Sequence, residues 1–354
     1  MASVGLIVNP SASRDVRRLT SLARTIDVHE RANAVARVLC GLAGGGVESV
    51  WFMPDPAHVV ERAHEALAAT PAAGVAAGLR LRPVVLGGDG YASDAAGTRA
   101  AAAALAEAGV ACLVTLGGDG TNRAVASGWP EAVLLPLSGG TNNAFATPLD
   151  PTAAGLAAAL YAADPARHDR HVVRRPRLEL RLDGAAPMIA LVDIAVVRGG
   201  WVGAHAIWDP GLLVEAVVAR SDPSLTGLAG VAGVVRPLDG QAVEAIHLRF
   251  GPPGQRVLVP LGPGQLVPIE VHDVRVLRPG ERIVVAGENG AVRRQVTLAF
   301  DGEREITLSP GSVAEVRLDA DGPRVLDAAV LLRAAAADGL MVTPDAPDRW
   351  GAAR

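Results

Sequence analysis

The sequence contains no lysine, so all 33 of its basic side chains are arginines. This absence excludes a P-loop lysine, a Schiff-base lysine and a pyridoxal phosphate site. If the protein binds phosphate, the charge has to be met by arginine, by backbone N–H groups or by a metal ion.

Cysteine, clustered positive charge and long hydrophobic runs are also scarce. Cys40 and Cys112 fall in a predicted helix and a predicted strand, which is typical of core residues in a reducing compartment. The formal net charge is −4 without any basic block, which argues against binding of nucleic acid. No signal peptide is indicated, and Gly, Pro or charge interrupts every apolar run. We therefore predict a cytoplasmic protein that does not insert into membranes.

The most informative stretch is residues 110–126. Residues 110–116 form a short apolar run, which is typical of a buried parallel strand. The sequence GGDGT follows, and a helix is expected from Asn122 to Ser127. A glycine-rich turn between a strand and a helix directs backbone N–H groups at one point and favours an anion. We therefore predict phosphate binding at Gly117, Gly118 and Gly120.

Asp119 is unusual in such a turn, because a carboxylate repels phosphate. A metal ion or a proton-transfer task would explain its presence, so we predict that Asp119 is a catalytic residue for phosphoryl transfer. Residues 86–90 also read LGGDG, but no Thr-Asn pair follows them. We expect this first copy to be a strand end and a loop, with Asp89 outside the site.

Strands and helices alternate along the first half of the chain. Strands are expected at residues 4–8, 47–53, 81–86, 110–116 and 133–135, with helices at 27–42, 57–69 and 95–108. This order predicts a parallel sheet covered on both faces, with ligands at the carboxyl ends of its strands. The loops after these ends supply further predicted nucleotide-binding residues, which are Asn9, Gly139, Gly140, Thr141, Asn142 and Asn143.

The pattern changes near residue 174 to short alternating runs, at 178–182, 246–250, 274–277 and 296–300. These runs predict antiparallel strands. We predict an α/β domain over residues 1–170 and a β-rich substrate domain over 171–322. A helix within 323–342 returns to the first domain, and a tail follows at 343–354.

Four features, in this order, resemble the NAD kinase/diacylglycerol kinase-like superfamily. They are Asn9-Pro10, the 117–122 motif, the 142–145 loop and Asp301-Gly302-Glu303. Residues 14–19 and 53–55 are most similar to the AcoX-type branch of the ATP-NAD kinase family. The resemblance implies a three-layer Rossmann-like domain followed by a β-sandwich, with ATP bound in the cleft between them.

The resemblance also implies contacts from Thr121 and Asn122 to phosphate or ribose, with Mg²⁺ as a second cofactor. It places Asp301 and Glu303 at the same cleft as catalytic or substrate-binding residues. A plain hairpin turn accounts for these two residues equally well.

The identity of the phosphoryl acceptor is less well defined. Arg123 follows Asn122 where NAD kinases usually carry an Asn-Glu pair, and their Thr-Gly-Ser-Thr-Ala-Tyr stretch is missing. We predict an ATP-dependent small-molecule kinase, with NAD or a related metabolite as the acceptor. A lipid kinase with an apolar groove near residues 225–235, and a non-catalytic nucleotide-binding protein, are the alternatives. Superfamily members favour homo-oligomers.

Overall fold

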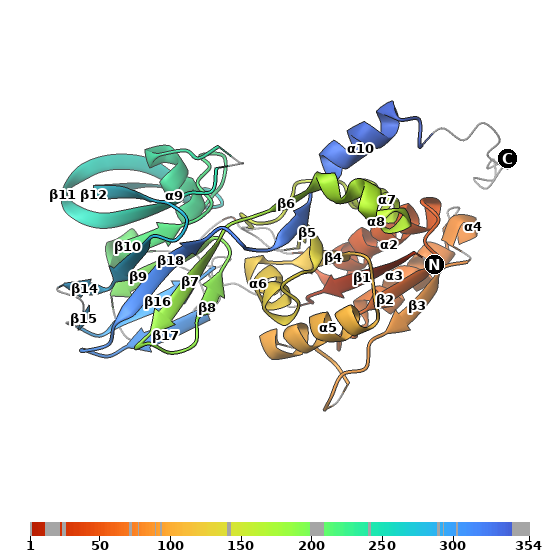
Figure 1. Ribbon diagram of the computed structural model, residues 1–354, viewed down its shortest axis with the longest axis horizontal. Helices are drawn as coiled ribbons and strands as arrows, with labels where there is room; N and C mark the ends of the chain where they lie inside the picture. The colour runs from red at the N-terminus through yellow and green to blue at the C-terminus, as the bar shows by residue number, and fades with distance from the viewer. Residues whose placement is uncertain are drawn as a thin grey trace.

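The computed structural model describes residues 2–10, 22, 26–70, 73–76, 78–88, 90–92, 94–139, 143–198, 209–239, 242–288, 291–292, 294–301 and 304–341. The predicted tail at 343–354 lies outside these residues. Two domains lie side by side in Figure 1, a parallel-sheet domain on the right and a β-rich domain on the left.

The parallel-sheet domain contains a seven-stranded sheet in the order β3-β2-β1-β4-β5-β19-β6. All neighbouring pairs are parallel except β6, which is antiparallel to β19. The strands are β1 (Ser3–Val8), β2 (Ser49–Phe52), β3 (Arg80–Pro83), β4 (Leu113–Gly117), β5 (Val133–Ser138), β6 (Val172–Arg174) and β19 (Arg324–Leu326). The prediction of a parallel sheet is confirmed, although the sequence did not predict β6 and β19.

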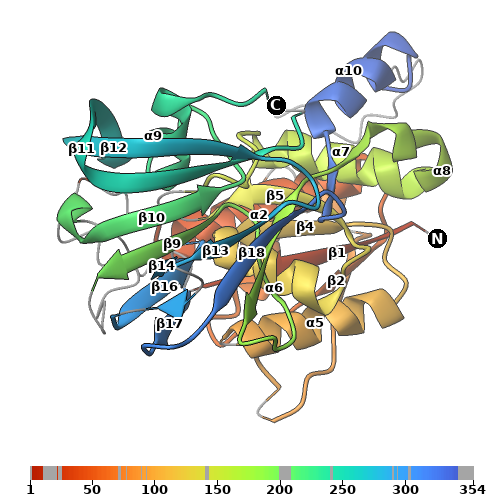
Figure 2. The ribbon, with the colours of Figure 1, turned by 60° about the vertical axis from the view of Figure 1, so that its left-hand side comes forward.

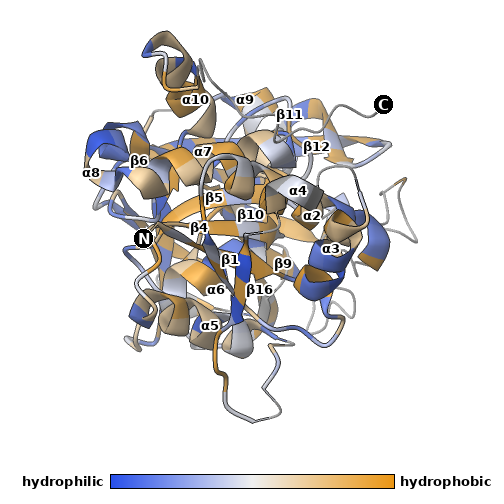
Figure 3. Cartoon of the chain, turned by 90° about the vertical axis from the view of Figure 1, so that its right-hand side faces the viewer, coloured by the Kyte–Doolittle hydropathy of each residue, from blue (hydrophilic) through white to orange (hydrophobic). Residues whose placement is uncertain are grey.

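Helices cover both faces of this sheet, which gives three layers (Figure 3). Leu6 and Val8 of β1 face the buried cluster with the helices α2 and α7, whereas Ile7 faces the cluster with α5 and α6. A strand buried on both faces has to be apolar at every position, which explains its continuous hydrophobic run. The helices are α2 (Val28–Gly44), α3 (Val59–Ala68), α4 (Ala73–Ala76), α5 (Ala95–Glu107), α6 (Asp119–Gly128), α7 (Pro151–Ala163), α8 (Pro165–His168), the 3-10 turn η1 (Asp169–His171) and α10 (Ala328–Ala337).

The β-rich domain is a sandwich of two antiparallel sheets, with strand orders β12-β11-β10-β9-β16-β17 and β13-β18-β7-β8. One buried cluster contains side chains from both sheets, which confirms the predicted β-sandwich. The strands are β7 (Arg177–Leu182), β8 (Met188–Ala190), β9 (Asp193–Arg198), β10 (Leu213–Val218), β11 (Ala245–Gly262), β12 (Gln265–Leu277), β13 (Arg282–Val285), β16 (Val296–Phe300), β17 (Arg304–Leu308) and β18 (Ala314–Asp319). A small ribbon, β14 (Gly287–Glu288) with β15 (Ala291–Val292), and the 3-10 turn η2 (Pro210–Leu212) complete the domain.

The outer face of the six-stranded sheet carries α9 (Leu228–Val235), which packs against the long β11–β12 hairpin at one edge of that sheet (Figure 2). At the hairpin tip, the carbonyl of Pro263 accepts a hydrogen bond of 3.0 Å from the backbone N–H of Leu22. The β-rich domain therefore reaches the chain segment that follows β1. No helix in the described part of the chain is long and apolar enough to cross a membrane.

Candidate active site

The loops that follow β1 and β4 meet where the strand order of the parallel sheet reverses. The chain runs from β1 to β2 and β3 on one side, then crosses to β4 on the other side of β1. Asn9 follows β1, and its backbone N–H donates to the carbonyl of Leu116 in β4 over 3.0 Å. In open α/β sheets, ligands bind at the carboxyl ends of the strands beside such a reversal. The fold therefore brings these predicted loops to the expected position.

Helix α6 begins within the glycine-rich sequence, at Asp119, and not at Asn122 as the sequence predicted. Its N-cap residue is Gly118, which has an extended backbone (φ −91°, ψ −178°) and provides no side-chain cap. The N-terminal end of a helix is positively polarised and presents backbone N–H groups. This end of α6 therefore favours an anion.

Two glycines of the site are required by close packing of the protein on itself. A Cβ atom on Gly117 would lie 2.6 Å from Oγ1 and 2.7 Å from Cβ of Thr121. A Cβ atom on Gly139 would lie 2.8 Å from the backbone nitrogen of Gly117. The glycines thus let the ends of β4 and β5 and the first turn of α6 approach one another.

Asn9 and Thr121 are joined directly, because Nδ2 of Asn9 donates to Oγ1 of Thr121 over 2.9 Å. The guanidinium of Arg31 is buried in α2 and donates to the carbonyls of Asn9 and Ile26. The loop after β1 is therefore fixed both to α6 and to α2.

Asn122 supports the glycine-rich turn from inside the protein. Its Oδ1 atom accepts from Oγ1 of Thr115 over 2.6 Å, and its Nδ2 atom donates to the carbonyl of Gly118 over 3.1 Å. The side chain is fully buried, so the predicted contact with a nucleotide would require this network to open.

The carboxylate of Asp119 holds the loop that follows β5. Its Oδ2 atom accepts from the backbone N–H of Ala144 over 2.9 Å, and Oδ1 accepts from Phe145 over 3.0 Å. Nδ2 of Asn143 donates to the carbonyl of Gly117 over 3.2 Å and to Oγ of Ser138 over 3.0 Å. The turn after β4 and the loop after β5 therefore form one hydrogen-bonded unit. The neighbouring predicted residues Gly140, Thr141 and Asn142 lie outside the described residues.

A pocket of about 250 Å³ opens beside this unit, between α2 and the ends of β4 and β5. Arg31, Leu116, Ser138 and Gly139 are among its lining residues. Pockets for whole small-molecule ligands measure roughly 300–1,000 Å³, so this space suits part of a nucleotide.

Sequence reasoning missed Arg220, which follows β10 in the β-rich domain and interacts electrostatically with Asp119. Burial lowers the pKa of the Arg220 guanidinium to about 10, and neighbouring Arg175 adds to the shift, whereas Asp119 and Asp222 act against it. Burial also lowers the pKa of Arg175. The backbone beside Arg220 is fixed, since the N–H of Ala219 donates to the carbonyl of Val192 over 2.8 Å. In a chain without lysine, an arginine directly after an apolar run that ends a strand was the available signal.

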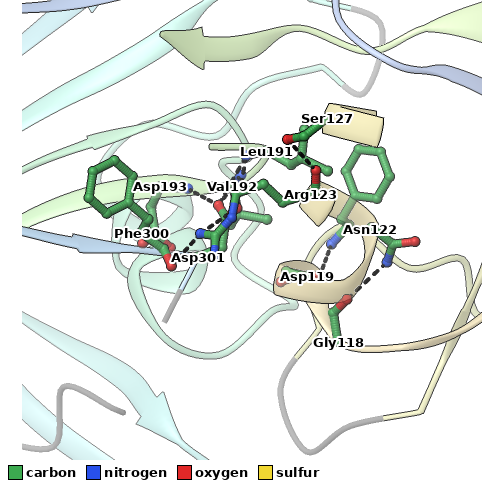
Figure 4. Close-up of polar contacts among 11 residues, drawn as sticks. Gly118, Asp119, Asn122, Arg123, Ser127, Leu191, Val192, Asp193, Phe300 and Asp301 are labelled. Atoms are coloured by element: carbon green, nitrogen blue, oxygen red, sulfur yellow. Dashed lines mark hydrogen bonds and ion pairs between the residues drawn. The ribbon is translucent and has the colours of Figure 1, made fainter. Parts of the chain in front are cut away.

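Asp301 lies at the domain interface, where Nη1 of Arg123 approaches its Oδ2 atom to 3.4 Å (Figure 4). Its carboxylate also accepts hydrogen bonds from the backbone N–H groups of Leu191, Val192 and Asp193. These contacts occupy the carboxylate, so the catalytic role of Asp301 stays a prediction. Glu303 lies outside the described residues.

Mg²⁺ is the second cofactor that the resemblance implies. Among the residues that the structure describes, no group of three or more His, Cys, Asp or Glu side chains could hold a metal ion. Both oxygens of Asp119 accept backbone N–H groups, and Asp301 is bound to backbone N–H groups and Arg123. We therefore assign no catalytic step to Mg²⁺.

Two comparisons identify the family. The family model for the acetoin catabolism protein X C-terminal domain matches residues 176–321. Acetoin catabolism protein X of Cupriavidus necator is 33% identical over 348 residues, which cover 96% of this chain and 93% of that protein. The chain belongs to the acetoin catabolism protein X family. This result confirms the resemblance to the AcoX-type branch, and the matched domain contains both Arg220 and Asp301.

Solved structures similar to this acetoin catabolism protein X family member are more distant. A putative diacylglycerol kinase from Bacillus anthracis str. Sterne is 12% identical, with a TM-score of 0.41, covering 92% of this chain and 96% of that chain. An NAD kinase from Archaeoglobus fulgidus in complex with ATP is 11% identical, with a TM-score of 0.35, covering 94% and 96% respectively.

Proposed function

We propose that this protein is a nucleoside triphosphate-dependent phosphotransferase that acts on a hydroxyl group of a small molecule. The observation that carries the proposal is the meeting of Asn9, the glycine-rich start of α6 and Asp119 at the strand-order reversal. A helix N-terminus in this position suits phosphate groups. We take ATP as the phosphoryl donor and NAD or a related metabolite as the first acceptor to test.

Charge supports the same proposal. Phosphoryl transfer depends on positioning and on positive charge around the phosphates. Arg220 supplies a cation from the β-rich domain that interacts electrostatically with Asp119, and burial lowers its pKa only to about 10, so it stays protonated at neutral pH. We propose that Arg220 balances phosphate charge, and that Asp119 is the catalytic carboxylate.

The apolar stretch that suggested a lipid acceptor has another explanation. Leu228, Val231 and Ala232 of α9 are buried against the six-stranded sheet. Because this stretch fills a core, it does not indicate an acceptor groove, and a small polar acceptor is the better proposal. The cytoplasmic location and the homo-oligomer stay predictions.

The proposal is tested by titrating ATP into the protein by calorimetry, and then by measuring ADP release with a panel of acceptors. The panel contains NAD, NADH, diacylglycerol and sugars. Acceptor-dependent ADP release supports a kinase and identifies its acceptor class. ATP binding without turnover for any acceptor would favour a nucleotide-binding protein that is not an enzyme, and the absence of ATP binding would contradict the proposal.

Gly118→Val is expected to weaken ATP binding by about tenfold or more while the protein stays folded. The φ angle of Gly118 is one that other residues adopt, so the change does not force the backbone into strain. The added side chain stands at the N-cap of α6, where a phosphate is expected. Calorimetry on a variant with wild-type circular dichroism gives the answer, and unchanged affinity would place the nucleotide elsewhere.

Arg220→Gln should lower ATP affinity by roughly tenfold, because a charge-assisted hydrogen bond contributes about 1.5–3 kcal/mol. The matched control is Arg282→Gln, which removes an exposed arginine of the same domain. Arg282 pairs with Glu315. We expect the control to bind ATP with wild-type affinity in the same titration. Equal losses in both variants would indicate a general effect of net charge.

A further inference from the structure

Asp301 fixes the connection between β8 and β9 from the end of β16. The carboxylate Oδ1 atom accepts from Leu191 over 3.0 Å, from Val192 over 2.8 Å and from Asp193 over 3.3 Å. The backbone N–H of Asp301 in turn donates to the carbonyl of Asp193 over 3.1 Å. Asp301 adopts a left-handed conformation (φ 47°), which is uncommon for residues other than glycine but is more readily adopted by aspartate than by most. The 191–193 connection and Asp301 are therefore a single rigid unit.

Arg123 joins this unit to the other domain. It comes from α6, and its Nη1 atom donates to the carbonyl of Phe300 over 2.9 Å and approaches Oδ2 of Asp301 to 3.4 Å (Figure 4). The side chain of Arg123 is 11% exposed and that of Asp301 is fully buried. A buried charge is costly unless it is paired and hydrogen-bonded, so each residue depends on the other.

The same helix carries the glycine-rich turn. Asp119, at the head of α6, binds the loop after β5, and Arg123 lies one turn further along and binds the β-rich domain. The buried cluster around this contact includes Val125 of α6 together with Leu191 and Val192. Helix α6 is therefore the element through which the position of the β-rich domain is transmitted to the candidate active site.

We propose that Arg123 and Asp301 form the interdomain junction that positions the β-rich domain over the glycine-rich turn. Both are positioning residues, and Asp301 does not act on the substrate itself. The consequence for catalysis rests on the proposed phosphotransferase function, whereas the junction does not. Arg220, in the β-rich domain, interacts electrostatically with Asp119, so a displaced junction would move this cation away from the site.

The test compares Arg123→Met with Arg177→Met by hydrogen–deuterium exchange of the ligand-free protein. Arg177 is the matched control, because its ion pairs with Asp319 and Glu179 lie within the β-rich domain. We expect Arg123→Met to accelerate exchange about tenfold or more in residues 119–128 and in residues 188–198, as loss of a buried hydrogen-bonding partner predicts. Arg177→Met should accelerate exchange in β7 and β18, where its ion pairs lie, and leave residues 119–128 and 188–198 at the wild-type rate.

Faster exchange in residues 119–128 alone, with 188–198 unchanged, would show that the junction does not couple the domains and would overturn the proposal. If Arg123→Met does not fold, Arg123→Lys provides the same test, because it keeps the charge but loses the planar guanidinium donors. It should accelerate exchange in both segments to a smaller extent, and acceleration in only one of them would again overturn the junction.

The catalytic consequence has a separate measurement. With ATP and the acceptor found in the panel, we expect Arg123→Met to lower kcat by about tenfold and to raise the KM for ATP, because a displaced Arg220 would no longer balance phosphate charge. Arg177→Met should change neither constant, and an equal fall in kcat for both variants would overturn the positioning role. If the wild-type protein itself neither binds ATP nor releases ADP, the proposed function fails, and the exchange experiment still decides the junction.

Discussion

Gly117→Ala is expected to destabilise the protein and abolish ATP binding, whereas Gly87→Ala leaves both properties near wild type. The new Cβ at residue 117 would lie within 2.7 Å of Oγ1, Cβ and Cγ2 of Thr121. Because the Cβ of Thr121 is itself too close, rotating the threonine side chain does not remove the clash. Relief requires α6 to shift away from β4, and overpacking of this kind costs about 1–3 kcal/mol.

Gly87 is the matched control because it occupies the same position in the first LGGDG copy. A Cβ on Gly87 meets no atom within 4 Å, and its backbone is not left-handed. Thermal unfolding and an ATP titration of the two variants provide the comparison. Similar losses in both would mean that the loop after β3 also takes part in the site.

Asp119→Asn is expected to retain ATP binding but to lose acceptor-dependent turnover by roughly 10²–10⁴-fold, the range for a positioned acid–base group. The substitution also disturbs the loop after β5. The carboxylate accepts one backbone N–H on each oxygen, from Ala144 and Phe145, so an amide NH2 would face one of these donors. An unsatisfied buried donor costs about 1–3 kcal/mol, and we therefore expect lower thermal stability as well.

Asp94→Asn is the matched control for Asp119→Asn, because it also removes a carboxylate at the start of a helix. It distinguishes a loss of catalysis from the general effect of losing such a carboxylate. Asp94 caps α5 by accepting from the backbone N–H of Gly97 over 2.7 Å, and asparagine caps helices about equally well. The control should keep wild-type turnover and stability. Wild-type turnover in Asp119→Asn would instead restrict Asp119 to holding the loop and favour the non-catalytic alternative.

Several features of the fold could be predicted from the sequence because they depend on local patterns. The apolar run at 110–116 became β4, and the alternation of strands and helices gave the parallel sheet. The alternating run at 178–182 became β7 of the sandwich. The first LGGDG copy lies in a loop after β3, as predicted, although Asp89 is outside the described residues. The expectation that ligands bind at the carboxyl ends of the strands also followed from these elements by general rules of α/β folds.

Other features depended on contacts between residues far apart in the chain. Strands β6 and β19 have only three residues each, which is too short for a recognisable hydrophobic pattern. They form because β19 pairs with β5 in the existing sheet and β6 pairs with β19. The start of α6 was placed three residues too late, since Asp119 and Gly120 are poor helix formers that tertiary contacts hold in the helix.

The roles of the polar residues were decided almost entirely by tertiary structure. The sequence by itself determined a glycine-rich turn with a carboxylate at a strand end, because φ freedom and helix polarity are local properties. Only the fold decided that Asn122 is buried under that turn, that Arg220 interacts electrostatically with Asp119, and that Arg123 meets Asp301 across the domain interface. Arg123 and Asp301 are 178 residues apart in the sequence, and no local pattern shows that two charged residues so far apart form a pair. Their pairing follows from their burial at the same place in the folded protein.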